Sequence, residues 1–433
     1  MRTAERTPRT LQRAVWASFA GTTLEWYDFF VYGAVAALAF NKVFFPGHDP
    51  TVGLLLSFAT FAVGFFARPF GALLFGHFGD TLGRKRVLVA TMLLMGLATV
   101  GIGLLPSYAQ AGVVSAYLLV LLRLLQGIAL GGEWGGAVLI VAEHGESSRR
   151  GLQTSWAQLG VPVGNLLSVG VLAIVSGVLS DSDFVSWGWR IPFLLSAVLV
   201  LVGLWVRTGI AESPEFSALA ADGAVARRPL VDLIRDHRKP LLIACFVRIG
   251  TDVAFYISTL FVLTYVSGTL GLDKTIALRG VLIASAIQIV LIPWFAALSD
   301  RYGRQRVFLI GSIGAALWSA PFFMLLDTRE PMLITVSICV AVTLWALMYG
   351  PLAAFISELF PVRVGYSGVS LGFQLAGIFG GGLAPLIATA LLRQFHTPMA
   401  VAVYVAGALI LTTVAVVYSF SLRTRASHGV TVT

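Results

Sequence analysis

The sequence predicts an all-α membrane protein whose twelve transmembrane helices form two pseudo-symmetric six-helix bundles. Hydrophobic residues make up 57% of the 433 residues and charged residues only 12%, against roughly 25% charge in an average soluble domain. A charged hairpin also occurs twice: residues 76–86 read GHFGDTLGRKR, and residues 296–306 read AALSDRYGRQR. Since each hairpin lies between two long apolar runs, the chain is a duplicated half, an arrangement typical of secondary transporters.

Twelve apolar stretches are long enough to cross a bilayer, which takes about 20 helical residues. The first stretch is too long for a cleavable signal sequence, and further spans follow it. We place the spans at residues 13–40, 51–76, 87–106, 112–142, 151–179, 188–208, 239–268, 276–298, 307–327, 331–358, 366–392 and 398–421.

The only long polar stretch between spans predicts the division into domains. Residues 1–208 are expected to form an N-terminal six-helix bundle and residues 239–433 a C-terminal one, joined by a cytoplasmic linker at 209–238. The linker is interpreted as a solvated connection rather than a regulatory domain.

Basic residues predict the orientation in the membrane. Of the 30 Lys and Arg, 21 fall on the side that carries both termini, 6 on the other side and 3 inside helices. By the positive-inside rule both termini are cytoplasmic, in an inner or plasma membrane. The net charge of +9 therefore reflects topology and contact with anionic lipid, and not binding of nucleic acid.

The residues that would carry enzyme chemistry are missing. Cys245 and Cys339 both lie within spans, the six histidines lie in loops or at helix ends, and no phosphate-binding loop occurs. We expect no enzyme activity, no cofactor and no metal site. The expected partners are a small-molecule substrate, protons and the lipid bilayer, with no nucleic acid and with the chain acting as a monomer.

The two hairpins have a physical interpretation of their own. Asp80 and Asp300 can cap a helix start and pair with Arg84 or Arg304, or with a neighbouring helix. Such a bond locks one conformation and must break in another, although charge that sets topology alone is the alternative. We therefore assign these four residues to gating.

A second charge pattern that repeats between the halves follows the fourth and tenth spans. Glu143 precedes Arg149 and Arg150, and Glu358 precedes Arg363. Both groups fall at the predicted cytoplasmic ends. Glu143 and Glu358 are therefore assigned to a charge clamp on the cytoplasmic gate and not to substrate contact.

Seven charged residues fall inside predicted spans. Each costs at least about 2.5–3.5 kcal/mol at the bilayer centre unless it has a partner or a water-filled cavity, so function is the default interpretation. These residues are Glu25, Asp28, Arg68, Arg123, Glu133, Arg248 and Asp252.

Helical spacing groups the charges of the first half. Glu25 and Asp28 share one face of the first span, and Arg123, Gln126 and Glu133 share an arc of the fourth. Beside that arc a small-residue seam recurs every four residues and predicts close helix packing. The seam consists of Gly127, Gly131 and Gly135.

Depth in the membrane predicts a proton-coupling pair. Counting from the helix ends places Asp28 and Arg123 at a similar level, so a salt bridge between them is expected. Protonation of Asp28 would release Arg123 to bind an anionic substrate. We rank Asp28 first as proton carrier, Glu133 second, and Glu25 as a further candidate.

In the second half, Arg248, Asp252 and Tyr256 stand four residues apart on one helix face. One interpretation is an internal ion pair with Tyr256 as packing. The other, which we favour, is that Arg248 binds a carboxylate while Asp252 or Tyr256 binds hydroxyl groups. Further polar residues expected to line the cavity, besides Arg123 and Gln126, are Gln158, Asn165, Gln288, Tyr349 and Gln374.

The hairpins carry a resemblance to a known family. Their pattern, Gly-x-x-x-Asp-x-x-Gly-Arg-Lys/Arg, resembles that of the major facilitator superfamily and is specific when found twice. Thr81 stands where Arg is common, and Ala296 replaces the opening Gly. These departures affect details of the hairpins and not the class.

Helical motifs narrow the resemblance. Residues 21–33 (GTTLEWYDFFVYG), 67–71 (ARPFG), 123–127 (RLLQG) and 131–136 (GGEWGG) resemble the metabolite:proton symporter family. Residues 248–256, 292–296 (IPWFA) and 380–382 (GGG) are most similar to its shikimate permease branch. The resemblance covers nearly the whole chain and implies the major facilitator fold.

The expected function is proton-coupled secondary symport that imports a small organic acid by alternating access. Protons are expected rather than sodium, since no oxygen-ligand cluster at a broken helix suggests a sodium site. Helix arginines favour a carboxylate, and the resemblance implies a shikimate-like one. The alternatives are a zwitterionic osmolyte (proline or betaine) symporter, an efflux antiporter and a non-transporting sensor, although no output domain for a sensor is visible.

Overall fold

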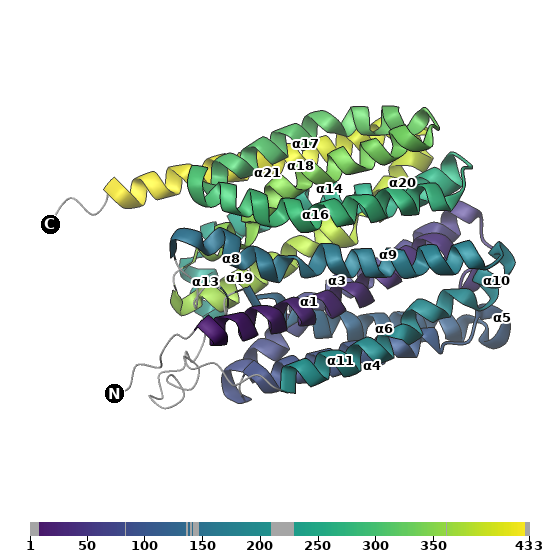
Figure 1. The fold of residues 1–433 in the computed structure, drawn as a ribbon, viewed down its shortest axis with the longest axis horizontal. Coiled ribbons are helices and arrows are strands. Elements are labelled where there is room, and N and C mark those ends of the chain that lie inside the picture. The colour runs from purple at the N-terminus through teal and green to yellow at the C-terminus, as the bar shows by residue number, and fades with distance from the viewer. Residues whose placement is uncertain are drawn as a thin grey trace.

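The computed structural model describes residues 8–82, 84–135, 137–138, 141, 147–208, 229–360 and 362–428. Within these ranges every regular element is a helix and no strand occurs. The long helices run along one common direction (Figure 1). Helix α1 (Pro8–Val35) begins and α21 (Pro398–His428) ends at the same end of the bundle. We call this the terminal end and the opposite end the far end.

Membrane-length helices account for most of the described chain. Ten helical segments are long and apolar enough to cross a bilayer, and Val89–Gly103 is a shorter apolar helix. Together with the 28-residue α1 they give twelve spans. Their outward side chains, such as Tyr117 and Leu317, are apolar and exposed, as expected where lipid is the neighbour. The predicted all-α, twelve-helix membrane fold is confirmed.

The first six spans and their connections have the following bounds. The spans are α1 with η1 (Ala36–Phe40), α3 (Pro50–Leu82), α4 (Arg84–Gly103), α6 (Val113–Gly131), α8 (Arg150–Gln158) with α9 (Gly160–Val178), and α11 (Ile191–Thr208). The connecting short helices are α2 (Asn41–Val43), α5 (Tyr108–Ala111), η2 (Ser147–Arg149), α10 (Asp181–Ser186) and η3 (Gly188–Arg190).

The last six spans follow a short helix, α13 (Pro229–Asp236). The seventh span is α14 (Arg238–Tyr256) with η4 (Ile257–Phe261), α15 (Val262–Thr264) and η5 (Tyr265–Thr269). The others are α16 (Lys274–Tyr302), α17 (Arg304–Asp327), α18 (Pro331–Ser357), α19 (Val362–Gly377) with η6 (Ile378–Gly382) and α20 (Ala384–Phe395), and α21.

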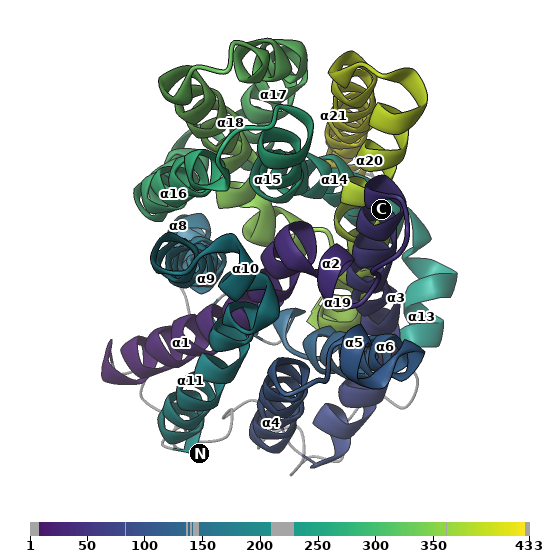
Figure 2. The ribbon, with the colours of Figure 1, turned by 90° about the vertical axis from the view of Figure 1, so that its right-hand side faces the viewer.

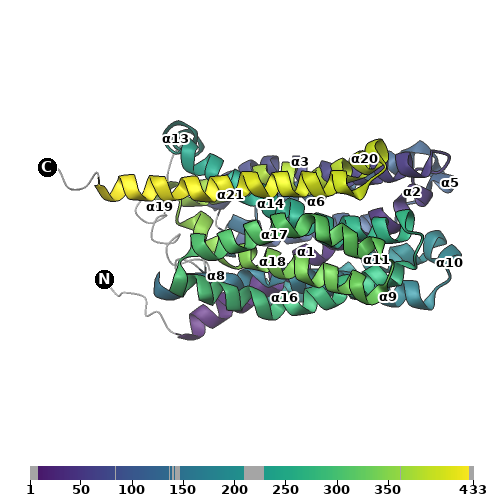
Figure 3. The same cartoon turned by 90° about the horizontal axis from the view of Figure 1, so that it is seen from above.

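The helices of the two sequence halves gather on opposite sides of the bundle (Figures 1 and 2). Figure 3 looks onto the side of the second half, with α17, α18 and α21 in view. In the first half α3 packs on α6, α1 on α9 and α4 on α11, while in the second α16 and α17 pack on α18 and α14 packs on α21. Across the seam α8 and α9 contact α16, and α3 contacts α19. The domain bounds stay a prediction, since much of the linker, residues 209–228, lies outside the described chain.

Glycines allow close approach at two helix crossings. A Cβ added at Gly127 or Gly131 would lie 2.1 or 2.0 Å from a carbonyl oxygen of α3, and one at Gly135 would lie 1.9 Å from Oγ of Ser370 on α19. No side chain fits at such separations, which are typical of close helix contact in membranes. The predicted packing role of this glycine seam is confirmed.

Four π-helical segments interrupt the spans in the described part of the chain. η1 lies in the first span, η4 and η5 in the seventh, and η6 in the eleventh. A π-helical turn disturbs the regular helix and occurs often at functional sites. The first, seventh and eleventh spans are therefore the places to examine for a binding site.

Candidate functional site

Three buried arginines lie midway along their helices: Arg68 on α3, Arg123 on α6 and Arg248 on α14, each with 1% of its surface exposed. Arg68 interacts electrostatically with both of the others. The ring of Phe29 from α1 contacts the guanidinium carbons of Arg68 at 4.4 Å and of Arg123 at 4.6 Å. We call Arg68, Arg123 and Arg248 the arginine cluster. The three positive charges lie close together and repel one another, so a negative charge placed among them is strongly attracted.

The predicted salt bridge between Asp28 and Arg123 is not formed among the described residues. Arg123 donates from Nη1 to Oε1 of Gln126 at 3.0 Å, and its guanidinium lies 4.1 Å from the ring centre of Tyr32. Asp28 instead accepts a hydrogen bond from the hydroxyl of Ser196 on α11. The two side chains, which the count along the helices predicted to pair, therefore take different partners.

A series of side chains connects Asp28 to Arg123 indirectly. Thr99 on α4 lies next to the Asp28 carboxylate and accepts a hydrogen bond from Nε2 of Gln126 at 2.7 Å. Gln126 in turn accepts from Arg123. We call Asp28, Thr99, Gln126 and Arg123 the polar relay. A change of charge at Asp28 can therefore reach Arg123 through two neutral side chains.

The structure brings Arg248 and Asp252 together as their spacing predicts. Nε of Arg248 lies 2.9 Å from Oδ2 of Asp252, and its Nη1 donates to the backbone carbonyl of Phe373 on α19. Tyr256, one turn further on, packs its ring against Phe29 and Phe65 of the first half. This face of α14 therefore lies on the seam between the halves.

Aromatic stacking joins the two halves next to Arg248, whose guanidinium carbon lies 3.0 Å from the ring centre of Phe373. The rings of Trp134 and Phe373 stack with centroids 3.4 Å apart, and Nε2 of Gln374 donates weakly to the carbonyl of Leu130 at 3.4 Å. Nothing in the sequence pointed to Trp134 and Phe373 as partners, since they come from different halves.

The predicted cavity-lining residues are all buried, and several of them have unused hydrogen-bonding atoms. Gln158 donates to the Tyr349 carbonyl at 2.9 Å, and Asn165 donates to Ser285 at 2.9 Å. Proteins bury few polar atoms without a partner, so each one needs an explanation such as a ligand. Within the described chain, buried atoms without a hydrogen-bond partner include Gln158 Oε1, Gln288 Oε1 and Nε2, Tyr349 Oη, Gln374 Oε1 and Arg123 Nε.

The remaining predicted proton carriers are also buried. Glu25 on α1 has 6% of its surface exposed and Glu133, just beyond α6, has 3%. Glu25 interacts electrostatically with Arg68. Both positions agree with a place inside the bundle.

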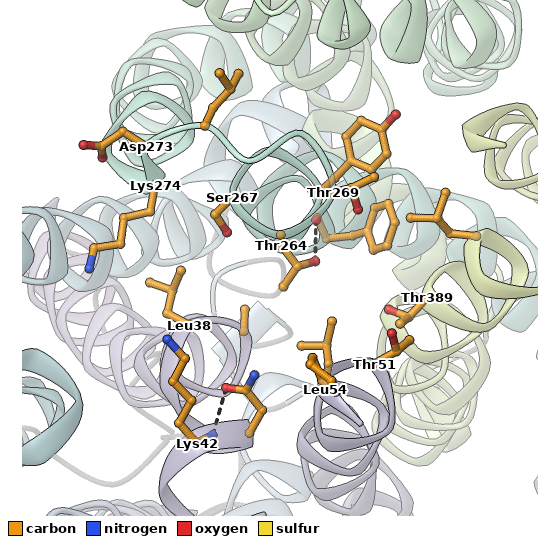
Figure 4. A pocket seen from close by; sticks show the side chains of 18 of the residues that line it. Leu38, Lys42, Thr51, Leu54, Thr264, Ser267, Thr269, Asp273, Lys274 and Thr389 are labelled. Atoms are coloured by element: carbon orange, nitrogen blue, oxygen red, sulfur yellow. Dashed lines mark hydrogen bonds between the residues drawn. The ribbon is translucent and has the colours of Figure 1, made fainter. Parts of the chain in front are cut away.

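A cavity of about 790 Å³ lies at the far end of the bundle. Figure 2 looks onto this end, and Figure 4 shows the lining side chains, among which Thr51, Thr264 and Thr389 come from both halves. Lys42 is exposed there, so the cavity reaches the surface. None of the site residues predicted from sequence lines it.

An ion pair joins the two halves at the mouth of this cavity. Nζ of Lys274, at the start of α16, lies 2.5 Å from Oδ1 of Asp181 on α10. This hydrogen bond and the charge of Lys274 hold the pKa of Asp181 below its usual value. One sequence signal could have indicated this cavity, namely the run of polar residues Thr264, Ser267 and Thr269 at the end of the seventh span.

Charged groups hold the halves together at the terminal end. Asp300 accepts hydrogen bonds from the backbone N–H groups of Gly151 and Leu152, both at 2.9 Å, where α8 begins. It also pairs with Arg304 at 2.8 Å, and Nε of Arg304 donates to Glu358 at 2.6 Å. A carboxylate at a helix N-terminus is stabilised by the helix dipole. We call Asp300, Arg304 and Glu358, with the start of α8, the terminal-end lock.

The turn that carries this lock depends on one glycine. Gly303 ends α16 and precedes α17 with φ of 99°, a conformation that side-chain-bearing residues rarely adopt. The first hairpin cannot be compared with it, because the side chains of Asp80, Arg84 and Glu143 lie outside the described part of the structure. Their gating roles stay predictions.

Comparison with known proteins decides the family. The profile described as Major Facilitator Superfamily matches residues 18–381. The chain belongs to the major facilitator superfamily. It is therefore a membrane transporter and not an enzyme.

Relatives within the superfamily agree with the motifs. The chain is 41% identical to the shikimate transporter of Escherichia coli K12 over 95% of both chains. It is 34% identical to the glycine betaine/proline/ectoine/pipecolic acid transporter of Dickeya dadantii, over 89% of this chain and 78% of the relative. The resemblance to metabolite symporters of the shikimate permease branch is thus confirmed.

A solved structure shares the fold. The crystal structure of a D-xylose–proton symporter superposes with a TM-score of 0.74 at 19% identity, covering 94% of this chain and 97% of the other. At this identity the likeness shows the major facilitator fold alone. Membership of the superfamily and this fold together make the chain a multi-pass secondary transporter.

Proposed function

We propose that the protein is a proton-coupled symporter that imports a small organic acid, of shikimate-like or other carboxylate type, by alternating access. With both termini in the cytoplasm, as the distribution of basic residues predicts, the far-end cavity faces outward and the terminal-end lock closes the cytoplasmic side. The structure then corresponds to an outward-facing state.

The observation that carries the proposal is the arginine cluster. Within the described chain only Asp252 forms an ion pair with it, through Arg248. An anionic substrate would supply the missing negative charge and the missing acceptors, as carboxylates do for arginine. Hydroxyl groups of the substrate would use the free oxygen and nitrogen atoms of Gln158, Gln288 and Tyr349.

The polar relay supports proton coupling through Asp28. When Asp28 is charged, the relay holds Gln126 and Arg123 in place. Protonation removes that charge, so the preferred arrangement of Arg123 changes, and with it the affinity for an anion. Glu133 and Glu25 stay as alternative proton carriers.

The second candidate function is symport of a zwitterionic osmolyte such as proline or betaine. Four buried acids, Glu25, Asp28, Glu133 and Asp252, could receive a cationic nitrogen, and a transporter with such substrates in its name is among the relatives. The higher identity to the shikimate transporter and the three arginines favour the organic acid.

Uptake into proteoliposomes tests the proposal. The panel is shikimate, 2-oxoglutarate, citrate, proline, betaine and an aromatic acid, each with an imposed inward proton gradient and each repeated with a protonophore. We expect accumulation of an organic acid that the protonophore abolishes. Uptake that persists without any proton gradient or membrane potential and stops when sodium is withdrawn would contradict it.

A further inference from the structure

Arg68 stands apart from the other buried arginines in its hydrogen bonding. It lies on α3 with its guanidinium carbon 3.9 Å from the ring centre of Phe65 and 5.9 Å from that of Trp26. Its Nε and Nη2 atoms are buried and have no hydrogen-bond partner in the described chain. Aromatic faces stabilise its charge in part, but they do not replace acceptors for its N–H groups.

The two unused nitrogens form one edge of the guanidinium. The N–H bonds of Nε and Nη2 point in the same direction, and this edge is a fork that matches the two oxygens of a carboxylate. The free atoms of Arg68 are therefore arranged as a complete bidentate anion site.

Arg190 shows how this chain treats an arginine with a structural role. It also stacks on an aromatic ring, with its guanidinium carbon 4.4 Å from Trp189. Its Nη1 donates to the Ser186 carbonyl at 3.1 Å and its Nη2 to the Leu105 carbonyl at 2.9 Å. Backbone carbonyls thus satisfy Arg190, whereas none satisfies the free edge of Arg68.

The other members of the arginine cluster are already engaged. Arg248 is paired with Asp252 and bonded to the Phe373 carbonyl. Arg123 donates from Nη1 to Gln126 within the polar relay and from Nη2 to the Phe61 carbonyl, which leaves its Nε without a partner in the described chain. Arg123 and Arg248 already have partners that a neighbouring charge can change. Arg68 differs from them because two adjacent nitrogens on one edge of its guanidinium have no partner.

The surroundings of Arg68 lie on the seam between the two halves. Phe65, which covers Arg68, packs against the second half: a Cβ added at Gly381 or Gly382 would lie 2.6 or 2.9 Å from its side chain. Its ring centre is also 5.7 Å from that of Tyr256 on α14. A small movement of the π-helical segment η6 relative to α3 would change access to Arg68.

We propose that Arg68 is the primary anchor for the substrate carboxylate, which it binds bidentately through Nε and Nη2. The rings of Phe29, Phe65 and Tyr256 then pack against the carbon skeleton of the substrate. The inference rests on the proposed function and names the site's main contact. Arg123 then couples the bound anion to the polar relay. Arg248 and Asp252 contact the part of the substrate opposite its carboxylate. The anchoring role of Arg68 applies to any substrate with a carboxylate, including a zwitterion.

Equilibrium binding to purified protein in nanodiscs tests this assignment. Labelled shikimate and labelled proline are the probes, with the methyl ester of shikimate as the neutral competitor, for the wild type, Arg68→Gln and Arg68→Lys. Arg279→Gln is the matched control, because Arg279 is exposed on α16 and its loss changes net charge alone. A thermal melt of each variant checks that it is folded.

We expect Arg68→Gln to lower the affinity for the probe that binds wild type by about 10- to 100-fold, the effect of losing charged hydrogen bonds. Arg68→Lys should recover only part of it, since lysine lacks the fork. The ester should bind both variants and wild type within about threefold, because it brings no charge to pair.

The outcomes separate this inference from the proposed function. A folded Arg68→Gln protein that binds its carboxylate probe within about threefold of wild type overturns the anchor. If Arg68→Lys does not fold, Arg68→Gln alone decides. If Arg68→Gln does not fold, Arg68→Lys decides, and wild-type affinity in that variant overturns the anchor. Wild-type binding without proton-driven uptake contradicts the proposed function only, and wild type that binds neither probe contradicts both.

Discussion

Replacing Asp300 with Asn removes the charge at the centre of the terminal-end lock and leaves its size unchanged. In the structure this carboxylate accepts three hydrogen bonds, from the N–H groups of Gly151 and Leu152 and from Arg304. Asn keeps one acceptor oxygen, so the lock loses bonds between α8 and the second half. The state that is open at the terminal end has no such bonds to lose.

The size of the effect follows from the geometry. The side chains of Asp300 and Arg304 are each 10% exposed, so water screens their interaction little. A hydrogen bond to a charged group contributes about 1.5–3 kcal/mol, and Asn retains part of the set. We therefore expect a shift of about 2–4 kcal/mol toward the open state, or about 30- to 700-fold in the equilibrium between the two states.

Distances between spin labels at the terminal end measure this shift. Trp16 on α1 and Ile310 on α17 are exposed and belong to different halves, so cysteines placed there, with Cys245 and Cys339 replaced, report separation of the halves. In Asp300→Asn the long-distance population should rise and transport turnover should fall more than substrate affinity. Glu330→Gln, at an exposed acid of the far end, is the control.

An unchanged distance distribution in Asp300→Asn would refute the lock. So would a large loss of equilibrium substrate binding by a normally folded variant, since that would place Asp300 in the binding site. A shift in Glu330→Gln as well would show that net charge, and not the lock, controls the equilibrium.

Other substitutions test the remaining parts of the account. Asp28→Asn mimics a permanently protonated acid, so it should block concentrative uptake yet keep substrate binding and exchange; accumulation against a gradient would transfer the role to Glu133 or Glu25. Arg123→Ala should lose both substrate binding and exchange. Arg248→Ala should weaken binding of carboxylates more than of neutral analogues, measured by competition, unless its pair with Asp252 is purely structural. Gly131→Val should lower the melting temperature, because its Cβ would lie 2.0 Å from a carbonyl oxygen, and an unaltered melt would contradict that packing.

Contacts that depend on spacing along the chain were predictable from the sequence, because helical periodicity and a short turn fix them. Arg248 and Asp252 are four residues apart and pair as expected. The glycine seam of the fourth span likewise contacts its neighbour as its period predicts. Asp300 and Arg304 meet across a hairpin whose glycine marks the turn.

Contacts between distant helices were not predictable, because they depend on rotation and tilt. A helix turns by about 100° per residue, so side chains that a count along the helices would pair can take other partners, as Asp28 and Arg123 do. The stack of Trp134 on Phe373 and the far-end cavity arise only when the two halves meet. The open edge of Arg68 could not be found from sequence at all, since it depends on which acceptors are absent nearby.

Movement of protons with the substrate is the central claim, and a pH-sensitive dye in weakly buffered proteoliposomes measures it directly. With the membrane potential clamped at zero and no sodium present, adding the organic acid outside should make the external medium more alkaline, and Asp28→Asn should abolish that signal while it still binds substrate. Substrate uptake without any alkalinisation, or uptake that appears only when sodium is added, would contradict the account.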